Sequence, residues 1–279
     1  MQYIETNYVS ELLETRKMEL AMIPSFQQMV VDSQKFRLPP NGLLLDVINF
    51  KQKREGDDSF VLDLEWFQDN YLPIFKLPYP FVALEYLQHH EKGINVKTIL
   101  IVTSNPEGTQ WRINYFYIIT EHGRPRTNGW QPFFYTLVFD VNELEYSFID
   151  SPLAAQKPID PSLQEHYTNE LVIALYVLLS FLAALNCSNI QQKEQLAPVK
   201  LNKKRSANGK VPFFDYKVLT VNTKEASPTK NGITGTHASP RQHLRRGHIR
   251  RLKNKHVWVN SCVVGDATKG MVKKDYNII

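Results

Sequence analysis

The chain has 279 residues, of which 43% are apolar and 11% aromatic, a composition that indicates a globular protein and excludes a disordered one. Its two cysteines, Cys187 and Cys262, are too few for a disulfide framework, and their spacing fits no zinc-binding pattern. We therefore expect a reducing, cytosolic compartment. The first 20 residues include acidic side chains and no continuous apolar segment, so no secretory signal is expected.

Charge is divided unevenly along the chain. Residues 193–279 contain 19 lysines and arginines and 5 acidic residues, a net charge of +14, whereas residues 1–192 contain 14 and 23, a net charge of −9. The division predicts two regions with different tasks: an acidic, aromatic-rich α+β region over residues 1–160, and a core helix with a basic αβ region over residues 161–279. The basic region suits a polyanion, and the acidic region does not.

The first predicted element is an amphipathic helix over residues 10–22, with Ser10 as its N-cap. A short apolar element over residues 42–50 and a solvated charged loop over residues 51–58 follow. The segment FVLDLEWF, residues 60–67, alternates between apolar and polar side chains and so predicts a strand.

A β-hairpin is predicted over residues 96–120. The run VKTILIVTS leads into the turn signal NPEG, and WRINYFYIIT follows directly. PFFYTLVFD, residues 132–140, predicts a further strand. Aromatic side chains are dense in these strands, and two interpretations are open: they fill the core from one face of a sheet, or they form a stacking or peptide-binding surface at an open edge.

The strongest helix prediction covers residues 162–185. Its apolar stretch, residues 171–185, is shorter than the roughly 20 residues that span a bilayer, so we expect a buried core helix. LNKKRSANGK, residues 201–210, predicts a basic loop, and VPFFDYKVLTV, residues 211–221, a strand. Residues 222–240 predict a mobile linker, VWVNSCVV (257–264) a strand, and residues 270–279 a last short strand.

Cationic side chains are most concentrated in RQHLRRGHIRRLKNKHVWVNSC, residues 241–262. This basic segment has five arginines, two lysines, three histidines and no acidic residue. Arginine presents a planar fork of donors that fits phosphate oxygens, and Gly247 permits close backbone approach. We therefore predict that the segment contacts RNA phosphates through Arg241, Arg245, Arg246, Arg250, Arg251 and Lys253. The alternative is a solubilising face, or a patch that pairs with the acidic region.

His243 and His248 support a second hypothesis. Two imidazoles beside a phosphodiester could act as general base and general acid in metal-independent RNA cleavage, and nearby arginines would lower the histidine pKa values. The alternative is that both are polar surface groups. No metal site is expected, because no carboxylate or thiol lies near these histidines or His237 in sequence. No cofactor is expected, because the chain has no phosphate-cradling glycine loop.

Three segments together resemble a known family. They are the helix LVIALYVLLSFLAALN, the strand PFFDYKVL and the C-terminal PRQHLRRGHIRR…VWVNSCVVG, within about residues 169–264. The combination resembles the AcrVA-two-like family, which phages and other mobile elements encode and whose named member is an anti-CRISPR protein that acts against the type V-A effector nuclease. Arg-Arg-Gly-His, residues 245–248, is the most specific part of the resemblance.

The resemblance implies an unusual activity. The family's studied activity lowers production of the effector, by recognising its nascent N-terminal peptide and triggering loss of the message being translated. No nuclease chemistry is established for the family, so the resemblance supplies no catalytic residues. It also assigns no peptide-binding residues.

The fold class expected from these observations is α+β, with an N-terminal helix and antiparallel sheet, a long central helix and a basic, strand-rich C-terminal region. The expected partners are RNA or a ribosome-associated message and the nascent peptide of a host defence protein. No membrane is expected, and the expected location is the cytoplasm of the bacterial host. Two other functions are open: a metal-independent ribonuclease that uses His243 and His248, and a direct, stoichiometric protein inhibitor.

Overall fold

The computed structural model describes the backbone of residues 7–40, 42, 64–70, 72, 75–90, 93–153, 161–221, 241–245, 248–259, 262–264 and 266–272. Side chains are described for the same residues except Met18, Trp66, Asn70, 161–164, 166, 241–248 and those after Val259. Within this part of the chain the fold is α+β, as the sequence predicts.

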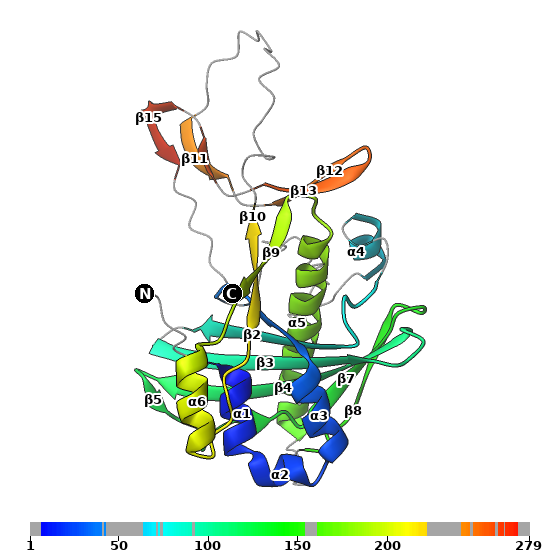
Figure 1. Cartoon of the computed structure of the whole chain (residues 1–279). Helices are drawn as coiled ribbons and strands as arrows, with labels where there is room; N and C mark the ends of the chain where they lie inside the picture. The colour runs from blue at the N-terminus through cyan, green and yellow to red at the C-terminus, as the bar shows by residue number, and fades with distance from the viewer. Residues whose placement is uncertain are drawn as a thin grey trace.

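A ten-stranded mixed sheet organises the molecule (Figure 1). Its main strands are β1 (Gln34–Arg37), β2 (Phe81–His89), β3 (Ile94–Ser104), β4 (Gln110–Glu121), β7 (Tyr135–Asp140), β8 (Glu145–Asp150), β9 (Ile190–Gln195) and β10 (Tyr216–Val221). They lie in the order β8-β7-β4-β3-β2-β1-β10-β9, and the short β5 (Arg124–Pro125) and β6 (Gln131–Pro132) pair with β4. The interior strand β1 is parallel to β2 and β10, and the other pairs are antiparallel.

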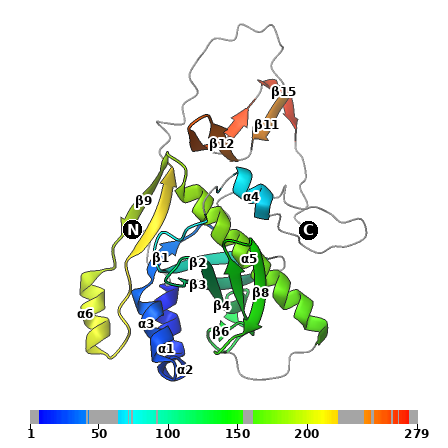
Figure 2. The ribbon, with the colours of Figure 1, turned by 90° about the vertical axis from the view of Figure 1, so that its right-hand side faces the viewer.

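Helices cover both faces of this sheet (Figure 2). The helices α1 (Tyr8–Thr15), α2 (Lys17–Ala21) and α3 (Pro24–Asp32) lie on one face, where the rings of Phe26 and Phe116 are 6.1 Å apart. The long helix α5 (Pro161–Leu185) lies on the other face, where the rings of Phe181 and Phe36 are 4.7 Å apart. The core is therefore two apolar layers on either side of the strands.

The predicted hairpin is confirmed as β3 and β4, which pair from Ile94–Glu121 to Ser104–Trp111. Side chains alternate across β4, so that Trp111 and Tyr115 face α5 and Phe116 faces α1–α3. Six of these aromatic side chains are almost fully buried, as the core interpretation requires: Trp111, Tyr115, Phe116, Trp130, Phe133 and Phe139. They do not fill the core from one face, because Phe116 and Trp130 belong to the α1–α3 layer and the other four to the α5 layer.

The predicted core helix is confirmed as α5. By length and composition its Tyr167–Leu185 portion is apolar enough to cross a membrane, and 72% of it is buried inside the protein. The packing of Phe181 on Phe36 and of Tyr167 on Phe133 shows that this apolar surface is covered by the sheet.

The predicted N-terminal helix is divided and starts earlier than expected. Asn7, not Ser10, is the N-cap of α1, because its side-chain oxygen accepts a hydrogen bond from the backbone N–H of Ser10 at 3.2 Å. The helix ends at Thr15, and α2 begins at Lys17.

Two segments fold as helices against the sequence prediction. The described part of the predicted strand over residues 60–67 belongs to α4 (Leu64–Asn70), in which Leu64 and Phe67, three residues apart, are buried on one side. The predicted basic loop over residues 201–210 is mostly α6 (Val199–Ala207). Lysine and arginine favour helices, and Gly209, with a φ of +66°, ends the segment in a conformation that suits glycine.

The predicted strand over residues 211–221 is correct only from Tyr216 onward. In its first half, backbone N–H groups donate to side chains and not to a neighbouring strand. The N–H of Val211 donates to the carboxylate of Glu14 at 3.0 Å, and that of Phe213 donates to the side-chain oxygen of Asn202 at 2.8 Å. The predicted strand over 257–264 is present as the end of β13 (Lys255–Val259) and as β14 (Cys262–Val264). The last described strand, β15 (Asp266–Val272), begins earlier than predicted, and the predicted segments over 43–58 and 222–240 lie outside the described residues.

Candidate nucleic-acid interface

Half of the basic segment forms a two-stranded hairpin, β12 (His248–Leu252) and β13 (Lys255–Val259), which we call the basic hairpin. Leu252 pairs with Lys255, so Lys253 and Asn254 form a two-residue turn. Asparagine suits such a turn, because its short polar side chain tolerates the backbone conformations that tight turns require.

The hairpin is fixed to the C-terminal end of α5 by backbone and side-chain hydrogen bonds (Figure 1). The buried amide of Asn189 bonds the backbone of Trp258 twice: Oδ1 accepts from N–H at 2.7 Å, and Nδ2 donates to the carbonyl oxygen at 2.8 Å. The backbone N–H of Ser188 donates to the carbonyl oxygen of His256 at 3.0 Å. These three bonds define the position of β13 relative to α5.

Apolar contacts add to this attachment. Ile249 and Val257 are only 8% and 7% exposed, and Ile249 belongs to the same apolar cluster as α5. Trp258 packs against that cluster. The cations of the hairpin therefore lie on two strands that are packed against the apolar cluster of α5.

The described cations of the hairpin are exposed. Arg250 and Lys255 lie diagonally across the two strands on one face, which places two like charges within reach of one anionic ligand. Lys253 is exposed at the turn. Arg251 is on the opposite face and donates to the backbone carbonyl oxygen of Asp69 in α4 at 3.0 Å.

Ion pairs within the protein do not neutralise these charges, as far as the described residues show. The five ion pairs among those residues use the cations Arg16, Arg37, Lys97, Arg126 and Arg205, all outside the hairpin. Pairing with the acidic region is thus not seen for Arg250, Arg251, Lys253 or Lys255. Within the described part of the chain, no carboxylate competes with a partner for these charges.

Three of the other residues predicted to act here belong to a different sheet from the hairpin. Arg241, His243 and Arg245 lie on β11 (Arg241–Arg245), in a three-stranded sheet with β14 and β15. His248 lies on β12, so the two histidines proposed as acid and base belong to different sheets. Their side chains, like Arg246 as a whole, lie outside the described residues.

Two observations on the described residues bear on nucleophilic and metal chemistry. Burial raises the pKa of the Cys187 thiol to about 12, so this cysteine stays protonated and unreactive. Among the described residues no group of three histidine, cysteine or carboxylate side chains is arranged to hold a metal ion.

A second basic surface, on α6, was not predicted. Lys200, Lys203 and Lys204 are exposed on this helix, beside the exposed apolar side chains of Leu196 and Val199. In Figure 1, α6 and the basic hairpin lie at opposite ends of the β9–β10 ribbon. The signal was the run Lys203-Lys204-Arg205, which suits a helix as well as a loop.

Comparison with known proteins does not assign this chain to a family. No family model, curated protein or solved structure matches this chain. The functional argument therefore depends on the geometry of the hairpin and on the motif resemblance.

Proposed function

We propose that this protein is a phage-type counter-defence protein that acts after transcription. It lowers production of a host defence effector by recognising the effector's nascent peptide and promoting loss of its message, in the cytoplasm of the bacterial host. In this proposal the basic C-terminal region contacts the RNA. The nascent-peptide and message-loss parts rest on the motif resemblance.

One observation carries the RNA-binding part: the basic hairpin is anchored to the core yet leaves Arg250, Lys253 and Lys255 exposed, without an ion pair among the described residues. Cations on an anchored strand pair bind phosphate with a smaller loss of backbone entropy than those of a mobile tail.

Filter binding of a labelled single-stranded RNA at increasing salt tests this part. The double variant R250E/K255E removes two phosphate contacts, so the slope of log K against log salt should become shallower by about 1.4. The matched control is K17E/R124E, which makes the same charge change at two exposed positions outside the basic region. Equal losses in both variants, or an affinity that does not respond to salt, would contradict RNA contact by the hairpin.

A reporter experiment tests the nascent-peptide part. The coding sequence for the first residues of a type V-A effector is fused to a reporter and expressed with this protein, and message abundance is measured. Synonymous recoding should leave message loss intact, whereas a frameshift that preserves the nucleotide sequence should abolish it. The opposite pattern would mean that the RNA sequence is recognised, not the peptide.

The same materials separate the two other functions. Cleavage of labelled RNA by the pure protein in the presence of a chelator, lost in H248A, would favour the ribonuclease. A stable stoichiometric complex with the mature effector, without RNA affinity, would favour a direct inhibitor.

A further inference from the structure

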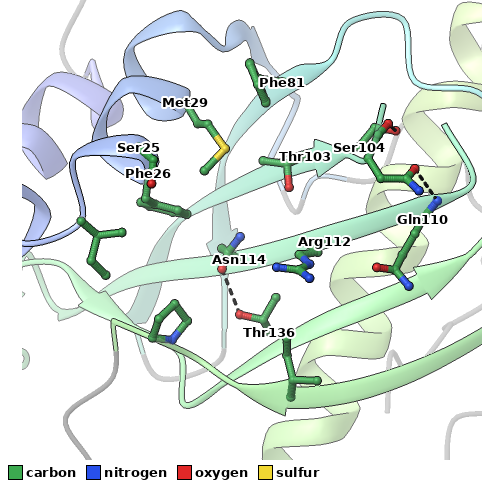
Figure 3. Close-up of a pocket in the computed structure, with 14 residues that line it drawn as sticks. Ser25, Phe26, Met29, Phe81, Thr103, Ser104, Gln110, Arg112, Asn114 and Thr136 are labelled. Atoms are coloured by element: carbon green, nitrogen blue, oxygen red, sulfur yellow. Dashed lines mark hydrogen bonds between the residues drawn. The ribbon is translucent and has the colours of Figure 1, made fainter. Parts of the chain in front are cut away.

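A pocket of about 360 Å³ lies between α3 and the sheet, on the face opposite α5 (Figure 3). Pockets of this size hold small organic molecules. Its apolar wall comes from α3 and neighbouring strands, with Phe26, Met29, Phe81 and Ile149 among the lining side chains. The pocket lies on a different part of the fold from the basic hairpin.

Side chains that the strand register places next to one another form the floor of the pocket. Phe81, Thr103 and Arg112 are cross-strand neighbours on β2, β3 and β4, so their side chains share this face of the sheet. Two residues further along β4, Asn114 lies on the same face and bonds to Thr136 of β7. The polar floor is thus built from rigid strands, where side-chain positions are well defined.

The floor presents hydrogen-bond donors and no negative charge. None of the fourteen lining residues in the described part of the chain is acidic. The Arg112 side chain, which reaches into the pocket in Figure 3, makes no ion pair or hydrogen bond with the described residues. Arg112 is exposed to solvent and has no carboxylate partner among the described residues, so its guanidinium can pair with an anionic ligand in the pocket.

Asn114 adds a second, buried donor. Its side chain is only 8% exposed, and its Oδ1 accepts the hydroxyl hydrogen of Thr136 at 2.9 Å. This bond fixes the amide so that Nδ2, a donor, is directed away from Thr136 and toward the cavity (Figure 3). A guanidinium and an amide N–H₂ directed at one apolar cavity form a donor set for carboxylate oxygens.

We propose that this pocket binds a small organic carboxylate that carries an apolar group. Arg112 and Asn114 bind the carboxylate, and the apolar group packs between Phe26, Met29 and Phe81. The inference does not depend on RNA binding or on the function proposed above.

Three probes that differ only in their polar end test the proposal: 3-phenylpropionate, 3-phenylpropan-1-ol and 3-phenylpropylamine. Binding is followed by NMR of ¹³C-labelled methionine methyl groups. The Met29 methyl lines the pocket and should shift, whereas Met22, which is 84% exposed and does not line the pocket, should shift much less. The acid should bind at least about tenfold more tightly than the alcohol, because charge-assisted hydrogen bonds are the stronger kind, and the amine should bind most weakly.

Two variants test whether Arg112 supplies the positive charge that binds the carboxylate. Arg112→Met keeps most of the side-chain volume, and it should remove the preference for the acid while leaving the alcohol affinity unchanged. Arg124→Met removes an exposed arginine at β5 and should change neither the preference for the acid nor the affinity for the alcohol. Equal binding of acid and alcohol by the unaltered protein, no Met29 shift at millimolar acid, or equal loss of both affinities in Arg112→Met would each overturn the proposal.

Discussion

The two faces of the central sheet bury different chemistry. The face under α5 is packed with aliphatic and aromatic side chains, including Phe36, Trp111 and Phe181, each with no exposed surface. The face under α1–α3 has a smaller apolar cluster, and polar groups lie within or beside it. One face is therefore chiefly apolar packing, while the other holds the buried charges and the candidate ligand pocket.

The buried charges of the α1–α3 face form one cluster. The carboxylate of Glu85 accepts the backbone N–H of Val9 at 2.6 Å and the hydroxyl hydrogen of Tyr216, and its second oxygen lies 3.7 Å from Arg37. Lys35 lies on the same face of β1 as Arg37, and its ammonium group is 4.2 Å from the ring centre of Phe214. The start of α1 thus rests on a charged group that is removed from water.

The largest expected effect tests whether the α5 face is the stability core. Phe181→Ala should lower the free energy of unfolding by about 3–5 kcal/mol, because it leaves a closed cavity beside Phe36. Phe26→Ala makes the same change on the other face. Phe26 lines the open pocket, so water can enter the space and the cost should be smaller by about 1 kcal/mol or more.

Urea denaturation of both variants measures this difference. Val31→Ala, at a position 38% exposed on α3, is the surface control and should change stability by less than about 0.5 kcal/mol. Equal costs for Phe181→Ala and Phe26→Ala would mean that the two faces are equally rigid.

The next effect, of up to about 3 kcal/mol, concerns pH and the α1–α3 face. Burial raises the pKa of Glu85 from 4.5 to about 7, although its hydrogen bonds and Arg37 oppose the shift. The folded protein therefore binds this proton more tightly than the unfolded chain does. The free energy of unfolding should fall as pH rises from about 4.5 to about 7.

Lys35 has the opposite dependence. Burial lowers its pKa from 10.5 to about 8, so the unfolded chain binds this proton more tightly, and stability should rise as pH increases above about 8. Stability should thus be lowest between about pH 7 and pH 8. Denaturation at a series of pH values should show that Glu85→Gln loses the falling limb and that Glu19→Gln, at an exposed position, retains it. A falling limb that persists in Glu85→Gln would assign it to another group.

The sequence predicted those parts of the fold in which local pattern and tertiary burial agree. The β3–β4 hairpin and α5 were correct because their apolar periodicity matches the surfaces they bury. Segments whose hydrogen bonds are made by distant residues were not predictable in this way. Residues 211–215 look like a strand, yet Val211 and Phe213 donate to the side chains of Glu14 and Asn202.

Of the two candidate sites, one could be predicted from a local sequence pattern and the other could not. The basic segment was evident from sequence, because seven cations without an acid stand out in 22 residues. The pocket was not, since Arg112, Asn114 and Thr136 are single polar residues in strands that otherwise read as core. They come together only through the register of β4 against its neighbours. Likewise, no local pattern in the sequence shows that Asn189, just after α5, holds the basic hairpin.

The smallest expected effect tests whether the stability of the α5 layer extends to the hairpin. Asn189→Ala leaves the backbone N–H and carbonyl of Trp258 without their partner, at a cost of about 1–3 kcal/mol that should be local to β13. Amide hydrogen exchange should therefore accelerate in residues 255–259 and stay unchanged in α1–α3. Asn186→Ala is the control, because among the described residues the Asn186 side chain bonds only the carbonyl oxygen of Leu182 in α5. If exchange accelerates throughout the sheet as well, then the hairpin and the core unfold as one unit, and the hairpin is a structural part of the α5 layer. If exchange changes nowhere, the Ser188–His256 hydrogen bond and the packing of Ile249, Val257 and Trp258 are enough to hold the hairpin in place.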